Sequence, residues 1–160
     1  MNIWLTGDTH LNHDRMVELC GRPKNHTELI IHNWASMVAW DDLTIHLGDV
    51  IFKEQSKITG ILAAIPGKKV LVKGNHDRES LKWYMEHGFD FACHSFVMSD
   101  IIYTHAPLQK LPDNIKLNIH GHYHNADITK FEVKPQSFNK LFALEYTNYK
   151  PVLLDEFIKL

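Results

Sequence analysis

The chain repeats one pattern four times: a short apolar run, then a glycine, then a side chain of a kind that binds metal ions. The four pairs are Gly7-Asp8, Gly48-Asp49, Gly74-Asn75 and Gly121-His122. The runs before them, residues 3–5, 43–47, 70–72 and 117–119, are short and β-rich, as buried strands are. Glycine lets the backbone turn sharply or pass close to a bound group. We therefore expect one site assembled from several strand ends.

The polar side chains beside these glycines combine carboxylate, amide and imidazole groups, which together suit divalent transition ions. Asp8 and His10 are two residues apart, so in an extended backbone both side chains point to the same side of the strand end. His122 and His124 repeat that spacing. Open α/β sheets collect ligands at the carboxyl ends of their strands, where these residues fall. The sequence therefore predicts a metal centre at that edge.

Five motifs in chain order carry a resemblance to a known family. They are Asp8-Thr9-His10, Gly48-Asp49, Gly74-Asn75-His76-Asp77, Thr104-His105 and Gly121-His122-Tyr123-His124. Each motif alone is weak evidence, but five in this order, each after a strand-like run, are specific. The chain resembles the calcineurin-like metallophosphoesterases, in particular small bacterial or phage-type members without a cap. The resemblance spans Asp8 to His124.

The resemblance implies two divalent metal ions. One would be held by Asp8, His10, Asp49 and His124, and the other by Asp49, Asn75, His105 and His122. We expect Mn²⁺, although Fe, Zn²⁺, Ni²⁺, Co²⁺ or Mg²⁺ also suits oxygen and nitrogen ligands. Such a pair clamps the phosphoryl oxygens and acidifies a water, so the implied reaction is attack of a metal-bound hydroxide on a phosphoester. A serine or cysteine nucleophile is not required.

Three further residues of the third motif have roles implied by the resemblance. His76 corresponds to the catalytic imidazole that protonates the leaving oxygen or steadies the phosphoryl group, and Asn75 also lies where substrate binds. Asp77 would act with His76, because a carboxylate that accepts from one ring nitrogen fixes the tautomer of the other. An equally ordinary role for Asp77 is to cap the helix that follows.

Several other histidines and one arginine lie outside the expected ligand set. His13 and Arg22 lie in the loop after the first strand, where they would contact substrate phosphate; the alternative is that they are merely solvated. His46 and His120 lie within strand runs, which favours buried, hydrogen-bonded histidines over ligands. We assign the surface to His26, His32, His87 and His94.

Periodicity places helices between the early strands. One begins near Thr27, a second carries an apolar stripe over residues 58–65, and a third begins near Asp77 or Ser80 and ends by Gly88. Later strands are expected over residues 96–98, 101–104, 117–119, 141–146 and 152–154. Alternating strands and helices predict parallel pairing in the first half, and the strand-rich second half needs another sheet to pack upon. The resemblance implies an α/β four-layer αββα sandwich of two mixed β-sheets flanked by helices.

Chain length and composition limit the expected number of domains, the location and the partners. With 160 residues, we expect a single metallophosphoesterase domain over 1–160. No run approaches the ~20 apolar residues of a membrane helix, and the start lacks the features of a secretory signal, so we expect a cytoplasmic protein that does not bind membranes. The two cysteines, Cys20 and Cys93, are expected to be reduced. A net charge of −2 disfavours duplex nucleic acid but leaves single-stranded ends as possible partners.

These features favour a phosphodiesterase that acts on nucleotides or other small phosphodiesters. So short a chain leaves few residues for a cap, so the site should be open to bulky leaving groups. The first alternative is a phosphomonoesterase, either a nucleotide or a protein phosphatase, which His13 and Arg22 would favour by binding terminal oxygens. The second alternative is a non-catalytic scaffold that binds a partner protein on the same fold. The presence of His76 argues against the scaffold.

Overall fold

A computed structural model describes residues 1–159 and contains two mixed β-sheets. The first sheet contains β1 (Ile3–Thr6), β2 (Leu43–His46), β3 (Lys68–Val72), β4 (Phe91–Cys93) and β9 (Val152–Leu153). Its strand order is β4-β3-β2-β1-β9. Strands β1 to β4 are parallel, and β9 is antiparallel to β1. The helical crossovers expected from the sequence account for the parallel pairing.

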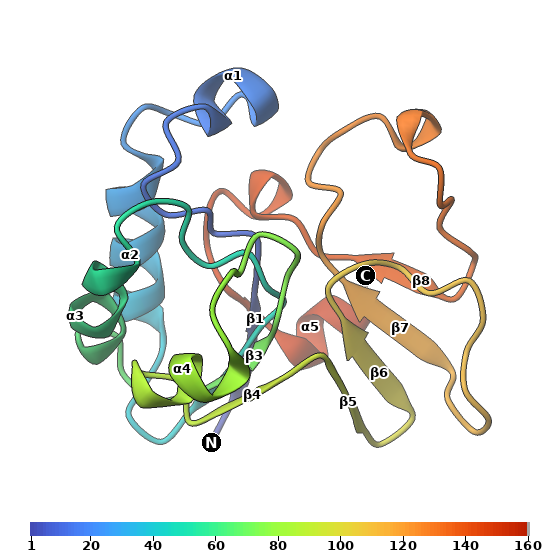
Figure 1. Ribbon diagram of the computed structural model, residues 1–160. Coiled ribbons are helices and arrows are strands. Elements are labelled where there is room, and N and C mark those ends of the chain that lie inside the picture. Colours follow the sequence, from blue (N-terminus) through green and yellow to red (C-terminus); the bar gives the residue numbers. More distant parts are fainter. Residues whose placement is uncertain (160) are drawn as a thin grey trace.

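The second sheet contains β5 (Ser95–Met98), β6 (Ile101–Thr104), β7 (Leu117–His120) and β8 (Asn139–Leu141), in that order. Strands β6, β7 and β8 are parallel, whereas β5 forms an antiparallel pair with β6. The two sheets lie beside each other, with the chain passing from the first to the second between β4 and β5 (Figure 1). This confirms the expected α/β class with two mixed sheets flanked by helices.

The helices are α1 (Met16–Cys20), α2 (His26–Met37), α3 (Ile58–Ala63), α4 (Leu81–Glu86) and α5 (Leu154–Lys159). Helices α2 and α3 lie on the side of the first sheet that faces away from the second sheet (Figure 1). Ser80 caps α4, because its side chain accepts a hydrogen bond from the Trp83 backbone N–H. Three short 3₁₀ turns complete the chain: η1 (Gln55–Lys57), η2 (Ile128–Lys130) and η3 (Leu144–Tyr146).

Strand register places the carboxyl ends of the parallel strands at one edge. Leu5 of β1 pairs with Ile45 of β2, which in turn pairs with Val70 of β3. Leu5 and Ile45 are fully buried, as are Tyr103 and Ile119 in the second sheet, so both sheets contribute to one core. The core therefore fixes the strand ends, and the loops that leave them meet above the sheets.

The structure differs from the sequence-based expectation in several short elements. Residues 141–146 were expected to be one strand, but β8 ends at Leu141 and the chain continues into η3. Phe142 and Leu144 are both fully buried apolar residues. In so short a buried run, the spacing of apolar residues does not distinguish a strand from a turn. Helices α1 and α5 and strand β4 were not expected. Each has six residues or fewer.

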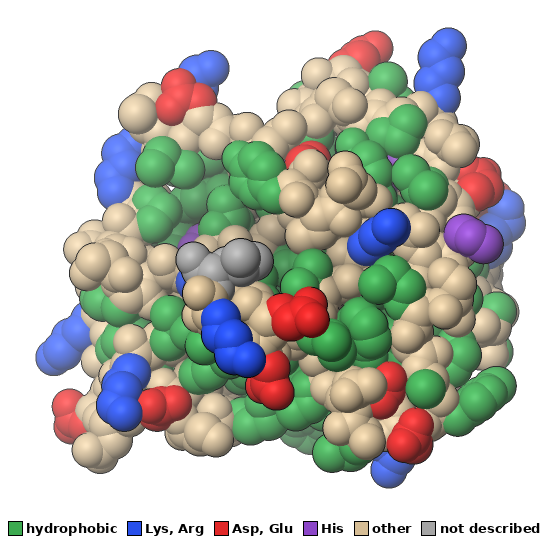
Figure 2. Space-filling model, turned by 180° about the vertical axis from the view of Figure 1, so that it is seen from behind, with side chains coloured by type: hydrophobic (Ala, Val, Ile, Leu, Met, Phe, Trp, Pro, Cys, Tyr) green, Lys and Arg blue, Asp and Glu red, His purple; other side chains and the backbone are tan. Residues whose placement is uncertain are grey.

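The length of the helices and the charge of the surface are relevant to membrane and nucleic-acid binding. Within residues 1–159, no helix is both long enough and apolar enough to cross a bilayer. The face opposite to that of Figure 1 carries basic and acidic side chains interspersed among apolar ones, without a broad patch of one sign (Figure 2). That face therefore lacks the basic stripe expected of a duplex nucleic-acid interface.

Candidate metal centre

The loops that follow the strands are joined directly to one another by backbone hydrogen bonds. The Asp8 N–H donates to the Gly48 carbonyl at 2.8 Å, and the His10 N–H donates to the Asp49 carbonyl at 2.9 Å. The loop after β1 therefore runs alongside the loop after β2. All seven predicted ligands lie in the loops at this edge of the sheets: Asp8, His10, Asp49, Asn75, His105, His122 and His124.

Two glycines in the repeated pattern are required by close approach. A Cβ atom on Gly74 would lie 2.1 Å from Oδ1 of Asp49, and a Cβ on Gly121 would lie 2.1 Å from Oδ2 of Asp8. Any other residue at either position would displace a carboxylate from the centre of the site. The glycine of the pattern is thus what allows the acidic side chain of another strand end to pass.

Five of the predicted ligands have a backbone conformation that non-glycine residues rarely adopt. Their φ angles are positive: 48° for Asp8, 42° for His10, 55° for Asp49, 72° for His122 and 51° for His124. Each such residue costs on the order of 1–3 kcal/mol and persists only where the surrounding structure imposes it. Strain of this kind clusters at functional sites, and here it coincides with the motif residues.

The first group of donors contains Asp8, His10 and His124, whose ligand atoms lie within 4.8 Å of one another. Nε2 of His124 is 3.8 Å from Oδ1 of Asp8. This oxygen is buried and has no hydrogen-bond partner within residues 1–159. A buried carboxylate oxygen without a partner is costly, and a cation among these donors would compensate it. The group therefore fits a divalent ion.

The second group contains Asp49, His105 and His122, again within 4.8 Å of one another. His105 Nε2 lies 2.8 Å from Asn75 Oδ1 and 3.0 Å from His122 Nδ1. The opposite ring atom, Nδ1 of His105, donates to the Leu47 carbonyl at 2.7 Å. This bond fixes the tautomer that leaves Nε2 available as a ligand atom. The group offers an amide oxygen, a carboxylate and two imidazoles to one ion.

Asp49 stands between the two groups. Its Oδ2 atom is 3.4 Å from Nε2 of His10 and 3.4 Å from Nε2 of His105. Its Oδ1 atom accepts a hydrogen bond from the His76 backbone N–H at 2.8 Å. One carboxylate therefore faces both sets of donors while the main chain holds it in place. This is the position that a ligand shared by two ions must occupy.

Electrostatics act differently on the four donor imidazoles. Burial opposes protonation of His105 and His124, but hydrogen bonds and charge from neighbouring groups outweigh it and raise the pKa of His105 to about 9 and that of His124 to about 10, so a metal ion must displace a proton from each. Burial lowers the pKa of His10 to about 2 and that of His122 to about 4, so both imidazoles are neutral at pH 7. Burial raises the pKa of Asp8 to about 6, which a nearby cation would lower again. Burial also opposes ionisation of Asp49, but hydrogen bonding and charge from His105 outweigh it and lower the pKa of this carboxyl group. The donors fit two divalent ions.

Asp77 is hydrogen-bonded to the main chain of two loops. Its buried carboxylate accepts hydrogen bonds from the backbone N–H groups of Asp49 and Gly74, both at 2.8 Å, and of Val50 at 2.9 Å. Within residues 1–159 it forms no hydrogen bond with the His76 ring, and α4, which begins at Leu81, is capped by Ser80 instead. Asp77 ties the loop after β2 to the loop after β3, and so positions Asp49.

His76 and His13 lie at the open side of the same site. The exposed His76 ring has its centroid 5.5 Å from that of His10. The His13 ring is also 5.5 Å from His10, and it stacks on Phe52 with centroids 3.7 Å apart. Both histidines line a cavity of about 460 Å³ together with His10, Asp49, His122 and His124. Their placement is compatible with the substrate contacts expected of them.

Arg22 is placed differently from the sequence-based expectation. Its side chain is 0% exposed, with Nη1 donating to the Thr9 carbonyl at 2.8 Å and Nη2 to the Asp8 carbonyl at 2.7 Å. Its Nε atom donates to Oε1 of Glu145 at 2.8 Å. Arg22 is therefore bonded to the main chain and to Glu145, and it is not among the residues that line the cavity beside the donor groups. Arg22 holds the loop that carries Asp8.

Glu145 is a residue of the site that sequence reasoning missed. It lies in η3, and His124 Nδ1 donates to its Oε1 atom at 3.3 Å. That contact leaves Nε2 of His124 directed toward Asp8. Burial opposes ionisation of Glu145, but His124 and Arg22 outweigh it and lower its pKa to about 2. A carboxylate behind a metal-binding histidine fixes the ring and raises its basicity. The available sequence signal was a lone acidic residue within an apolar run.

We expect Glu145→Gln to weaken metal binding about 10- to 100-fold, because the neutral amide neither attracts His124 nor balances Arg22. Calorimetric titration of the metal-free variant with Mn²⁺ measures the change directly. Glu156→Gln, an exposed glutamate on α5, is the matched control and should bind as the unmodified protein does. Equal affinities for both variants would show that Glu145 does not position His124.

His46 and His120 are buried as expected, whereas His26 is buried against expectation. His46 is fully buried, with Nε2 3.1 Å from Thr9 Oγ1, and His120 is fully buried, with Nδ1 donating to the Gly121 carbonyl at 2.8 Å. Both therefore confirm the prediction of core histidines. His26 was assigned to the surface, but it is 2% exposed because it packs at the start of α2.

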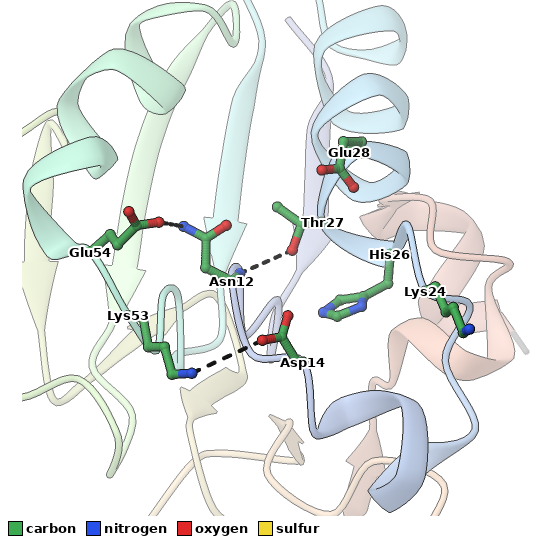
Figure 3. A pocket seen from close by; sticks show the side chains of 8 residues that line it. All are labelled: Asn12, Asp14, Lys24, His26, Thr27, Glu28, Lys53 and Glu54. Carbon is green, nitrogen blue, oxygen red and sulfur yellow. Dashed lines mark hydrogen bonds and ion pairs between the residues drawn. The ribbon is translucent and has the colours of Figure 1, made fainter.

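A second hollow, of about 220 Å³, lies away from these donors (Figure 3). It is lined by polar and charged side chains, and several pair with one another. Asn12 Nδ2 donates to Glu54 at 3.3 Å, and Lys53 lies 4.0 Å from Asp14. None of the seven predicted ligands lines it.

The sequence was compared with models of known protein families. The model described as calcineurin-like phosphoesterase matches residues 1–158. The chain belongs to this family. Membership accounts for the motif order and for the two donor groups at the strand ends, and it implies divalent metal ions and a hydrolase that acts on phosphoester bonds. The resemblance inferred from the motifs is thereby confirmed.

Individual relatives extend the likeness over the chain. An uncharacterized protein of Methanocaldococcus jannaschii is 30% identical over 166 aligned residues, which cover 99% of this chain and 90% of that protein. The Gene 66 protein of Mycobacterium phage L5 is 35% identical over 82 residues, covering 48% of this chain and 40% of the phage protein. The crystal structure of a protein of unknown function from Aquifex aeolicus shares the fold, with a TM-score of 0.73, 24% identity and coverage of 99% and 98%.

Proposed function

We propose that this calcineurin-like phosphoesterase is a dinuclear metal-dependent phosphodiesterase that acts on nucleotides or other small phosphodiesters. One observation supports the proposal above all. Two donor groups share the carboxylate of Asp49, and they open onto a cavity of about 460 Å³ that also contains His76. A paired site of this kind suits in-line displacement at phosphorus.

In this proposal, Asp8, His10 and His124 would hold one ion and Asn75, His105 and His122 the other, and the Asp49 carboxylate would be available to both. When bound, the ions stabilise charge on the phosphoryl oxygens and lower the pKa of water. The chain itself supplies position and protons. Asp77 and the His76 backbone N–H fix the Asp49 carboxylate. The exposed His76 ring is placed to donate a proton to the leaving oxygen as the ester bond breaks.

The placement of Arg22 favours a diester over a monoester. A phosphate monoester carries up to two negative charges at pH 7, one more than a diester, and needs additional cationic donors for its terminal oxygens. Arg22 is one of the two candidates for that role, but its guanidinium is buried and bonded to Asp8, Thr9 and Glu145. The remaining candidate, His13, has its pKa lowered by burial, which disfavours the cationic form that a terminal oxygen would need.

The purified protein with Mn²⁺ should hydrolyse bis-(p-nitrophenyl) phosphate with a kcat/KM about 10-fold above that for p-nitrophenyl phosphate, a difference of roughly 1.4 kcal/mol in transition-state stabilisation. A chelator should abolish both activities, and added Mn²⁺, Co²⁺, Ni²⁺ or Zn²⁺ should restore them to different extents. Preference for the monoester would instead support the phosphomonoesterase alternative, in which His13 contacts a terminal oxygen.

The non-catalytic scaffold is less well supported, since His76 and all seven predicted ligands are present and gathered at one edge. A cytoplasmic location is part of the same proposal. Single-stranded nucleic-acid ends are included among the proposed substrates because the cavity is open to bulky esters. Lack of turnover on a broad panel of phosphoesters with each divalent metal would instead support the non-catalytic scaffold function.

A further inference from the structure

We propose that the cavity beside the donor groups contains an apolar subsite that binds a flat aromatic ester group of the substrate. The inference rests on the proposed function, because it identifies what the phosphodiester carries in addition to its phosphate. It assigns specificity to the cavity walls, and in particular to Leu19. The substrate class is an anionic phosphodiester with an uncharged ring, such as an aryl group or a nucleobase, on one of its esters.

The cavity has walls from two segments that are distant in sequence. One wall is α1, which contributes Met16, Leu19 and Cys20, and the other is the loop after β7, which contributes Tyr123, Ala126 and Phe131. In Figure 1, α1 and the loop that carries η2 both rise above the carboxyl ends of the strands. The predicted ligands form the base between them. The space of about 460 Å³ is far larger than a phosphate group requires.

The wall after β7 is held rigidly next to a predicted ligand. Phe131 stacks on Tyr123, with centroids 3.9 Å apart and planes 18° from parallel. The Tyr123 hydroxyl donates to the Val133 carbonyl at 2.5 Å, which anchors the stack in its loop. The Phe131 ring centroid is 6.3 Å from that of His122. A group attached to a phosphate at the donor groups would therefore reach the aromatic wall directly.

The α1 wall is fixed relative to the loop and presents apolar surface. The Asn125 side chain donates to the Cys20 carbonyl at 3.0 Å, so the loop after β7 is bonded to the end of α1. Met16 is buried beneath the wall, whereas Leu19 is 57% exposed on the cavity. A large apolar side chain left exposed at a reactive cavity gains from being covered by an apolar ligand. A preformed pair of walls needs little reordering to bind one.

Charge also selects the occupant. Apart from the predicted ligands, the lining found within residues 1–159 contains one charged side chain, Arg15, and no acidic one. Nothing in the walls repels an anionic diester, and an apolar wall favours a ring over a charged or strongly hydrated group. A planar aromatic ester group satisfies the shape, the polarity and the charge of the cavity together.

The test compares two substrates with the same leaving group: phenyl p-nitrophenyl phosphate and methyl p-nitrophenyl phosphate. With Mn²⁺, the unmodified protein should show a kcat/KM at least about 10-fold higher for the phenyl ester, which is the scale of discrimination available to an apolar pocket. Leu19→Ser should reduce this preference about 5-fold or more, because it should lower kcat/KM for the phenyl ester more than for the methyl ester. The matched control is Val97→Ser on β5, where Val97 is 50% exposed and does not line the cavity.

A binding measurement separates the inference from the proposed function. Diphenyl phosphate should bind the Mn²⁺-loaded protein more tightly than dimethyl phosphate in calorimetry, and Leu19→Ser should remove the difference. If neither p-nitrophenyl diester is hydrolysed but diphenyl phosphate still binds preferentially, the proposed function fails and the subsite stands. If both diesters are hydrolysed without preference, or diphenyl phosphate binds no better than dimethyl phosphate, the subsite is overturned and the phosphodiesterase stands.

Discussion

Asp49→Asn should lower kcat/KM for a phosphodiester at least about 1000-fold, equivalent to roughly 4 kcal/mol of transition-state stabilisation. Asp49 is the carboxylate that both donor groups share, with Oδ2 at 3.4 Å from His10 and from His105. A neutral amide in its place leaves two neighbouring cations without the charge that separates them. We expect the variant to lose at least one equivalent of metal, measured by elemental analysis after dialysis.

Asparagine is a better replacement than alanine at this position. Residue 49 has a φ of 55°, a region in which asparagine and aspartate are tolerated better than residues with apolar side chains. The variant should therefore keep its fold, which the thermal unfolding midpoint of the metal-free protein checks. The control is Asp14→Asn, because the Asp14 side chain is 94% exposed and outside the donor groups. Full metal content with more than about a tenth of the activity would contradict the assignment of Asp49.

The donor groups were predictable from the sequence because their determinants are local. A ligand directly after a strand and a glycine is placed by its own strand, and the parallel register brings the strand ends to one edge. The glycines are evident in the sequence alone, but the reason why they are required is a tertiary contact. Gly74 and Gly121 are required because Asp49 and Asp8 pass within 2.1 Å of where a Cβ would lie. The repeated glycine pattern therefore reflects tertiary contacts that can be identified only in the folded structure.

Residues that support the ligands were not predictable in the same way. Arg22 and Glu145 are 123 positions apart and meet only because η3 folds back onto the loop after β1. No local pattern pairs them, and an arginine after the first strand has the same appearance whether it binds phosphate or the main chain. The partners of Asp77 are not predictable from the sequence for a related reason. Its neighbour in sequence is His76, but its hydrogen-bond partners are backbone groups of two loops.

His76→Ala should lower kcat about 100- to 10,000-fold while leaving metal content unchanged, because general acid catalysis contributes rate enhancements of that size. The His76 side chain is exposed at the cavity, so its removal leaves the donor groups intact. Only its backbone N–H bonds to Asp49, and alanine keeps that N–H. The loss therefore reports on the ring alone. Elemental analysis and steady-state kinetics measure the two quantities separately.

The leaving group decides whether the His76 ring donates a proton. A good leaving group such as p-nitrophenolate departs without protonation, whereas an alcohol of high pKa needs a proton as the ester bond breaks. The variant should therefore lose much more activity on a poor leaving group than on p-nitrophenyl esters. His94→Ala, an exposed histidine outside the cavity, is the matched control. An equal loss on both leaving groups would instead assign the ring to steadying the phosphoryl group.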